Sequence, residues 1–151
     1  MSKLIVMILS LLPLSFSFAS GVSEKEILNL ILPEKLKSVK LNETSKSMIV
    51  KEYGEPQKTV GDIDYYELEG IRYPFAVKYG KDGTVIYISY MYPKPSLKLK
   101  DLKNYVTEKD LTDAAMAPRE MGLHYKAKKG KISFEFRNNS EMTLTSFIWG
   151  I

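Results

Sequence analysis

The stretch that most constrains the fold is a pair of alternating segments around the tight turn Lys81-Asp82-Gly83. Before the turn, every second residue is aromatic or apolar: Tyr73, Phe75, Val77 and Tyr79. After it, Thr84 to Tyr92 is again rich in β-branched and aromatic residues. Residues with a period of two share one face of a strand, and Asp-Gly favours a hairpin turn. The sequence therefore predicts an antiparallel hairpin, although both faces of its second strand are apolar.

Two helices are predicted before this hairpin. Ser23 and Glu26 form a capping box, and Pro33 ends the first helix because proline lacks an amide donor. Asn42 or Thr44 is the expected cap of the second helix. This helix should end near Tyr53, since Gly54 and Pro56 follow it.

The remaining segments predict a second group of strands. Asp62 to Leu68 is the expected strand before the hairpin. Leu97 to Leu111 fits one longer or two shorter helical pieces, with a continuation to a stop at Pro118 as a further option. Three further strands are predicted by alternation and by turn residues: Leu123 to Lys128, Ile132 to Arg137 and Met142 to Trp149.

The N-terminus has the pattern of a signal peptide. Lys3 precedes an apolar run from Leu4 to Leu14, and Ser17-Phe18-Ala19 is a small-x-small cleavage site. A transmembrane anchor is the alternative, but the run is about half of the roughly 20 residues that a spanning helix needs. We expect cleavage near Ala19 and a periplasmic or secreted protein without a stable membrane anchor.

Composition excludes several classes of protein. The chain has no cysteine, so neither a disulfide framework nor a lipid anchor on cysteine is available. Its formal net charge is +4, from 22 basic and 18 acidic residues that are interspersed along the sequence. Nucleic-acid binding needs a concentrated basic face, and no such concentration is visible in the sequence. We therefore expect no nucleic-acid partner.

The two predicted sheet segments match each other when the chain is shifted by about 59 residues. Tyr66 then meets Tyr125, and Phe75 meets Phe134. Two alternatives remain open. The chain is a tandem repeat of a helix-and-three-strand unit, divided into residues 20–92 and 93–151 after a signal peptide of residues 1–19, or it contains two unrelated three-stranded meanders.

Three short motifs resemble those of the SmpA/OmlA, or BamE-like, family of small envelope proteins. They are Glu52-Tyr53-Gly54-Glu55-Pro56 at a helix end, Asp64-Tyr65-Tyr66 in a strand, and Val77 to Val85 in the hairpin. The resemblance covers about Leu41 to Tyr92 and implies an α+β fold, with helices packed on one face of an antiparallel sheet. A doubled unit also resembles beta-lactamase inhibitory protein, whose open sheet face grips a protein partner.

Catalytic groups are scarce. His124 is the single histidine, and no nucleophile or metal signature surrounds it. Strand carboxylates such as Asp62 and Asp64, or Glu67 and Glu69, are an alternative acid and base for hydrolysis. A charged strand edge is the favoured explanation of these residues. We expect no catalysis, no cofactor and no metal, and keep a carboxylate-dependent hydrolase as the alternative.

Aromatic residues are more informative because they occur on both faces of the predicted strands. If helices cover one face, the other exposes a candidate binding surface: Tyr65, Tyr87, Met91 and Trp149. Tyrosine and tryptophan dominate binding energy at protein interfaces. We expect a soluble, exported binding or scaffold protein that engages an envelope or extracellular protein. Inhibition of a secreted hydrolase is the alternative function, and the same aromatics could instead fill the core or a homodimer interface.

Overall fold

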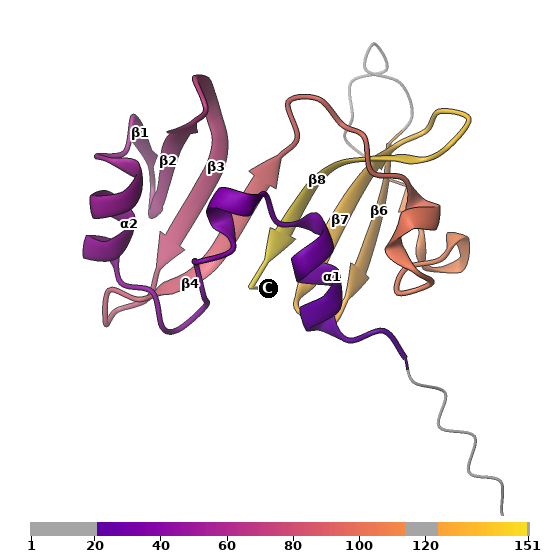
Figure 1. Cartoon of the computed structure of the whole chain (residues 1–151), viewed down its shortest axis with the longest axis horizontal. Helices are drawn as coiled ribbons and strands as arrows, with labels where there is room; N and C mark the ends of the chain where they lie inside the picture. Colours follow the sequence, from indigo (N-terminus) through magenta and orange to yellow (C-terminus); the bar gives the residue numbers. More distant parts are fainter. Residues whose placement is uncertain (1–20, 114–123, 151) are drawn as a thin grey trace, which may run out of the picture.

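The computed structural model describes residues 21–113 and 124–150 (Figure 1). The predicted signal peptide and the expected helical segment from Ala114 to Pro118 lie outside the described residues. Eight strands are present in the described part of the chain: β1 (Lys58–Val60), β2 (Ile63–Leu68), β3 (Ile71–Tyr79), β4 (Val85–Met91), β5 (Thr112–Asp113), β6 (His124–Lys129), β7 (Ile132–Arg137) and β8 (Thr143–Trp149).

These strands form one antiparallel sheet in the order β1-β2-β3-β4-β8-β7-β6-β5. Strands β4 and β8 lie side by side at its centre and join the two halves (Figure 1). The hairpin predicted around Lys81-Asp82-Gly83 is confirmed, because β3 and β4 pair directly. The other predicted strands are also present, with ends that differ by one or two residues.

Both predicted N-terminal helices form. Helix α1 (Glu24–Ile31) begins with the expected capping box, in which the Ser23 hydroxyl accepts from the Glu26 amide at 3.3 Å. Helix α2 (Lys46–Tyr53) ends at Gly54 with φ +83°, as predicted. Its cap is Ser45, however, and not Asn42 or Thr44. Thr44 instead bonds to the Lys40 amide and to Val85 of β4, which fixes the loop before the helix.

The predicted α+β class is wrong. Each α-helix contains only eight residues, while one sheet of eight strands organises most of the described chain. The fold is nearly all-β. The short helices close one side of the core and do not form a layer of their own (Figure 1).

Of the one longer or two shorter helical pieces expected from Leu97 to Leu111, the structure has two short ones. Both are 3-10 turns, Leu99–Leu102 and Glu108–Asp110. Asp101 and Asp110 each accept a hydrogen bond from the backbone amide three residues earlier, which starts a new turn each time. Lys103 and Asn104 between the turns have φ of 50° and 62°, so the α-helix cannot continue through them.

A single row of buried residues crosses six neighbouring strands and forms the centre of the core. Each member is a direct cross-strand partner of the next and is almost fully buried: Tyr66, Phe75, Tyr90, Phe147, Phe134 and Ala127. We call the sheet side that holds this row the inner face. Cross-strand aromatic pairs stabilise a sheet beyond the area that they bury.

A bulge decides which side of β4 is buried. Tyr79 pairs with Val85 and Lys78 pairs with Tyr87, so Ile86 is the extra residue. Val85, Ile88 and Tyr90 therefore all point inward, although strict alternation would separate Val85 from Ile88. Periodicity alone could not assign these faces for that reason.

The tandem repeat of helix-and-three-strand units, one of the two alternatives, differs from the described structure in two respects. The described part of the connection between the sheet halves, residues 93–113, contains 3-10 turns and no counterpart of α2. Strand order is similar in the two halves, but the register of the β3–β4 pair differs from that of the β7–β8 pair. Phe75 pairs with Tyr90, whereas Phe134 pairs with Phe147 and not with Trp149, which the shift of 59 residues requires.

Helix α1 is attached to the inner face at both ends. At its first turn, Glu24 accepts hydrogen bonds from the Trp149 indole and from the Lys131 amide, both at 3.3 Å. At its last turn, the Tyr92 hydroxyl donates to the Ile31 carbonyl. Burial raises the pKa of Tyr92, so this hydroxyl remains a donor at neutral pH.

Candidate functional site

The sheet side opposite the core has a flat centre and is the main candidate for binding. We call it the outer face and define it by the row of cross-strand partners next to the core row: Tyr65, Ala76, Ser89, Ile148, Ser133 and Lys128. A second outer row runs parallel to it through Met91, Ser146, Glu135 and Lys126. Small side chains in both rows make the centre of this face shallow.

The described helices and 3-10 turns all approach the inner face. Helix α1 reaches Trp149, α2 reaches Asp64 through Lys46, and Tyr105 of the segment between the two 3-10 turns packs its ring against Phe134. Consistent with this, outer-face side chains other than Ala76 are half-buried or exposed. Met91 has a relative exposed area of 63%, a high value for an apolar side chain at the centre of a sheet.

The structure brings together three of the four residues predicted for the binding surface. Tyr65, Tyr87 and Met91 lie on the outer face, on strands β2 and β4, which flank β3. Trp149 points to the opposite side, where it is the partner of Ile88 and Ile132. Its indole donates to Glu24, so Trp149 helps to attach helix α1 and is not part of the outer face.

Sequence reasoning missed the non-aromatic part of this surface. Ile148 and the small residues Ala76, Ser89, Ser133 and Ser146 separate Tyr65, Tyr87 and Met91 from the lysines of β6. The signal was present, since Ser89 and Ser133 each lie between two large buried residues of their strand. A hydrophobicity pattern depends on the large apolar residues, so the small residues between them are easily overlooked.

A small depression of about 110 Å³ lies on the outer face between β6, β7 and β8. Ser133, Ser146, Ile148 and Lys126 contribute to its lining. Glu135 beside it accepts a hydrogen bond from the Ser146 hydroxyl at 2.9 Å, and its other oxygen lies 3.3 Å from His124 Nδ1. His124 thus lies in a polar cluster on the outer face, beside this depression.

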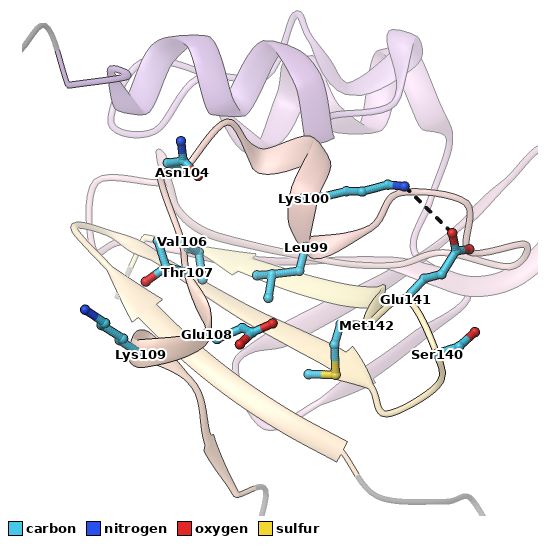
Figure 2. A pocket seen from close by; sticks show the side chains of 10 residues that line it. All are labelled: Leu99, Lys100, Asn104, Val106, Thr107, Glu108, Lys109, Ser140, Glu141 and Met142. Atoms are coloured by element: carbon cyan, nitrogen blue, oxygen red, sulfur yellow. Dashed lines mark ion pairs between the residues drawn. The ribbon is translucent and has the colours of Figure 1, made fainter.

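A larger groove of about 700 Å³ lies at the β6 end of the molecule (Figure 2). Its apolar part comes from Leu99, Val106 and Met142, and charged residues including Lys109 and Glu108 stand at its sides (Figure 2). No member of the predicted binding surface contributes to this groove. Its walls are the two 3-10 turns and the β7–β8 turn.

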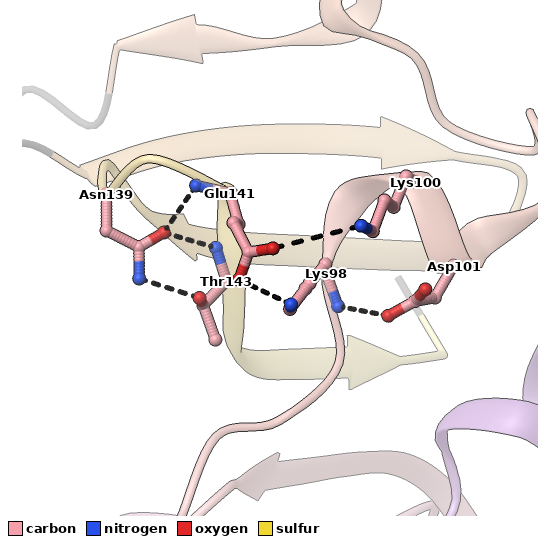
Figure 3. A network of polar contacts seen from close by, with 6 residues as sticks. All are labelled: Lys98, Lys100, Asp101, Asn139, Glu141 and Thr143. Atoms are coloured by element: carbon pink, nitrogen blue, oxygen red, sulfur yellow. Dashed lines mark hydrogen bonds and ion pairs between the residues drawn. The ribbon is translucent and has the colours of Figure 1, made fainter.

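Internal contacts already use much of the polar wall of this groove (Figure 3). Glu141 pairs with Lys98 and, at 3.8 Å, with Lys100. The hydrogen bond from Lys98 holds the pKa of Glu141 below its usual value. Asn139 accepts from the amides of Glu141 and Thr143, both at 3.2 Å. The network joins the β7–β8 turn to the segment after β4, and we interpret the groove wall as structural.

The carboxylates considered for hydrolysis do not form an acid-base pair. Asp62 is exposed and paired with Lys78 at 2.5 Å, while Asp64 is buried and accepts from Lys46 at 2.8 Å and Thr59 at 2.7 Å. Burial acts to raise the pKa of Asp64, but these hydrogen bonds outweigh it and the pKa is lowered. The hydrogen bond from Lys78 lowers the pKa of Asp62. A general acid needs the opposite shift.

The other two carboxylates are engaged at the surface. Glu67 accepts a hydrogen bond from the Gln57 side chain, and Glu69 pairs with Lys35 at 3.6 Å. Within the described residues, no group of three His, Asp or Glu side chains is placed to hold a metal ion. Neither α1 nor α2 in that part of the chain is long and apolar enough to cross a membrane.

Comparison with known proteins adds a likeness of fold. The chain matches no protein-family model and no curated protein. Among solved structures it is similar to YjgB of Bacillus subtilis, a DUF4309 family protein, with a TM-score of 0.52 and 16% sequence identity. The match covers 83% of this chain and 90% of YjgB. This likeness is one of fold alone. The resemblance to BamE-like proteins stays a prediction.

Proposed function

We propose that this chain is an exported binding or scaffold protein without catalysis, periplasmic or secreted after cleavage near Ala19. Its partner is an envelope or extracellular protein, and the contact surface is the outer face. The observation that supports this proposal is the position of Tyr65, Tyr87 and Met91 on a sheet side that no described helix approaches. Aromatic side chains and methionine are enriched at protein interfaces.

The outer face suits a protein partner better than a small molecule. Its centre is broad and shallow, and its depression of about 110 Å³ is smaller than the roughly 300–1,000 Å³ typical of ligand pockets. The larger groove has enough volume, but its Glu141 wall is occupied by Lys98 and Lys100. A partner with a complementary flat surface would cover the outer face without any rearrangement of the backbone.

Replacing Tyr87 and Met91 of the outer face should weaken binding. We expect Tyr87→Ala combined with Met91→Ala to weaken partner binding by about tenfold or more, because buried aromatic anchors dominate interface energy. Affinity capture from envelope and culture-medium fractions, followed by mass spectrometry, would identify proteins retained by the unmodified chain. Their affinities for purified variants would then be measured.

Met48→Ala is a matched control for this experiment. Met48 is 54% exposed, similar to Met91, but it lies on helix α2 and not on the sheet. A partner that binds the unmodified chain and Met48→Ala, but not the outer-face variant, would support the proposal. Equal binding by all three proteins would contradict the outer face as the contact surface.

A further inference from the structure

The outer face is the basic side of the sheet. Five basic residues and one acidic residue occupy its cross-strand positions: Lys58, Lys78, Lys126, Lys128, Arg137 and Glu135. Glu67 and Arg72 lie near the irregular end of the β2–β3 pair. Their charges are opposite, so including them would not change the net charge of the outer face. The formal net charge of the whole chain is +4. The excess of basic over acidic residues therefore gathers on one face, although basic and acidic residues are interspersed in the sequence.

Two neighbouring cations of this face, Lys126 and Lys128, are available to a partner, while the exposed Lys58 and Arg137 lie on other strands. Lys78 is engaged by Asp62, and Glu135 is engaged by His124 and Ser146. Lys126 and Lys128 are exposed, and among the described residues neither has an ion-pair partner. They project from neighbouring outer positions of β6, two residues apart. The β6 side of the outer face therefore presents two uncompensated ammonium groups.

The apolar and basic parts of the outer face have a defined separation. Met91, Ser146, Glu135 and Lys126 are successive partners across β4, β8, β7 and β6. Three strand spacings make this distance about 14 Å, which is about four residues of extended polypeptide. The depression at Ser133 and Ser146 lies on this path.

We infer that the outer face binds an acidic polypeptide segment. An apolar side chain of the segment contacts Tyr87 and Met91, and carboxylates about four residues further along contact Lys126 and Lys128. This inference rests on the proposed function and specifies the chemistry of the partner. Complementary charge fixes the orientation of the segment, and the apolar contact supplies most of the affinity.

The same face is less suited to a lipid surface or to nucleic acid. Clusters that bind anionic lipids typically contain about four to eight basic residues close together. The five basic residues of the outer face are spread over four strands, and only Lys126 and Lys128 are neighbours, beside the Glu135 carboxylate. Nucleic-acid binding likewise relies on many phosphate contacts along a basic stripe. An acidic peptide needs only a few carboxylates and one apolar group.

The test uses two synthetic peptides of about twelve residues, each with a leucine near its centre. One peptide carries glutamates about four residues after the leucine, and the other carries glutamines at the same positions. Isothermal titration at low salt would measure both affinities for the full mature chain. We expect the glutamate peptide to bind about tenfold more tightly, with the difference lost at high salt. Lys126→Gln combined with Lys128→Gln should remove the difference. Lys94→Gln with Lys109→Gln, two exposed lysines elsewhere, should keep it.

The outcomes separate this inference from the proposed function. Equal binding of both peptides, lost in the Tyr87→Ala/Met91→Ala protein, would overturn the acidic partner and retain the outer face. No binding of either peptide would also overturn the inference, while the capture experiment still tests the function. Binding to phosphatidylglycerol vesicles that requires Lys126 and Lys128, without peptide binding, would replace the acidic segment by a lipid surface and overturn the inference.

Discussion

Phe147→Ala is expected to lower the free energy of unfolding by about 3–5 kcal/mol, the range measured for large-to-small changes of buried aromatics. Phe147 lies at the centre of the core row, between its partners Tyr90 and Phe134. It is 1% exposed, and the centre of its ring is 6.1 Å from those of Tyr90 and Tyr92. Truncation would leave a cavity where the two halves of the sheet join.

Thermal and denaturant unfolding of the mature chain would measure this loss. The expected decrease in Tm is about 10–15 °C for a domain of this size. Ile148→Ala is a matched control, because Ile148 is the next residue on the same strand but lies half-buried on the outer face. It should cost about 1 kcal/mol. Similar losses for the two variants would mean that both faces of β8 are packed as core, contrary to the fold described above.

Lys46→Met should destabilise the protein through the buried carboxylate of Asp64. Asp64 is 3% exposed, and Lys46 and Thr59 are its side-chain hydrogen-bond donors. Removing the lysine head leaves the carboxylate with one donor, so we expect a loss of about 2 kcal/mol. Asp64→Asn in the same chain should recover part of this loss, since the amide needs no charged partner.

Lys78→Met is the control, because Lys78 forms a similar pair with the exposed Asp62. Exposed ion pairs contribute little, and we expect no measurable change. A double-mutant cycle on Lys46 and Asp64, followed by urea unfolding, would give the coupling energy directly. Additive effects of the two substitutions would contradict the interaction that attaches α2 to the sheet.

The same pair predicts a dependence on pH. The pKa of Asp64 is lower in the folded chain than its ordinary value of about 3.9. The carboxylate therefore stabilises the fold above that value, and its contribution is lost as the pH falls through the lower folded pKa. Asp64→Asn should show a shallower decline in stability below about pH 4. Parallel curves for the two proteins would contradict this prediction.

The shape of the outer face explains why binding is a reasonable function for so small a fold. Ala76, Ser89, Ser133 and Ser146 keep its centre shallow, while Tyr65, Tyr87 and Met91 provide apolar contact area on one side. The lysines of β6 stand on the other side. A surface of this kind can orient a partner by charge and hold it by apolar contact.

Much of the local structure could be predicted from the sequence because it depends on neighbouring residues. The capping box of Ser23 and Glu26, the helix stop at Gly54 and the hairpin around Asp82-Gly83 each arise within a few residues. Local hydrogen bonding and alternation are sufficient for such predictions.

The fold class and the composition of the outer face depended on contacts between distant segments. The bulge at Ile86 determines which side of β4 is buried, and pairing of β4 with β8 merges two meanders into one sheet. That pairing placed Trp149 on the inner face beside Glu24, 125 residues away in sequence. It also placed the lysines of β6 on the same face as Met91. Alternation along one strand identifies residues that share a face, but only pairing between strands determines which face they share.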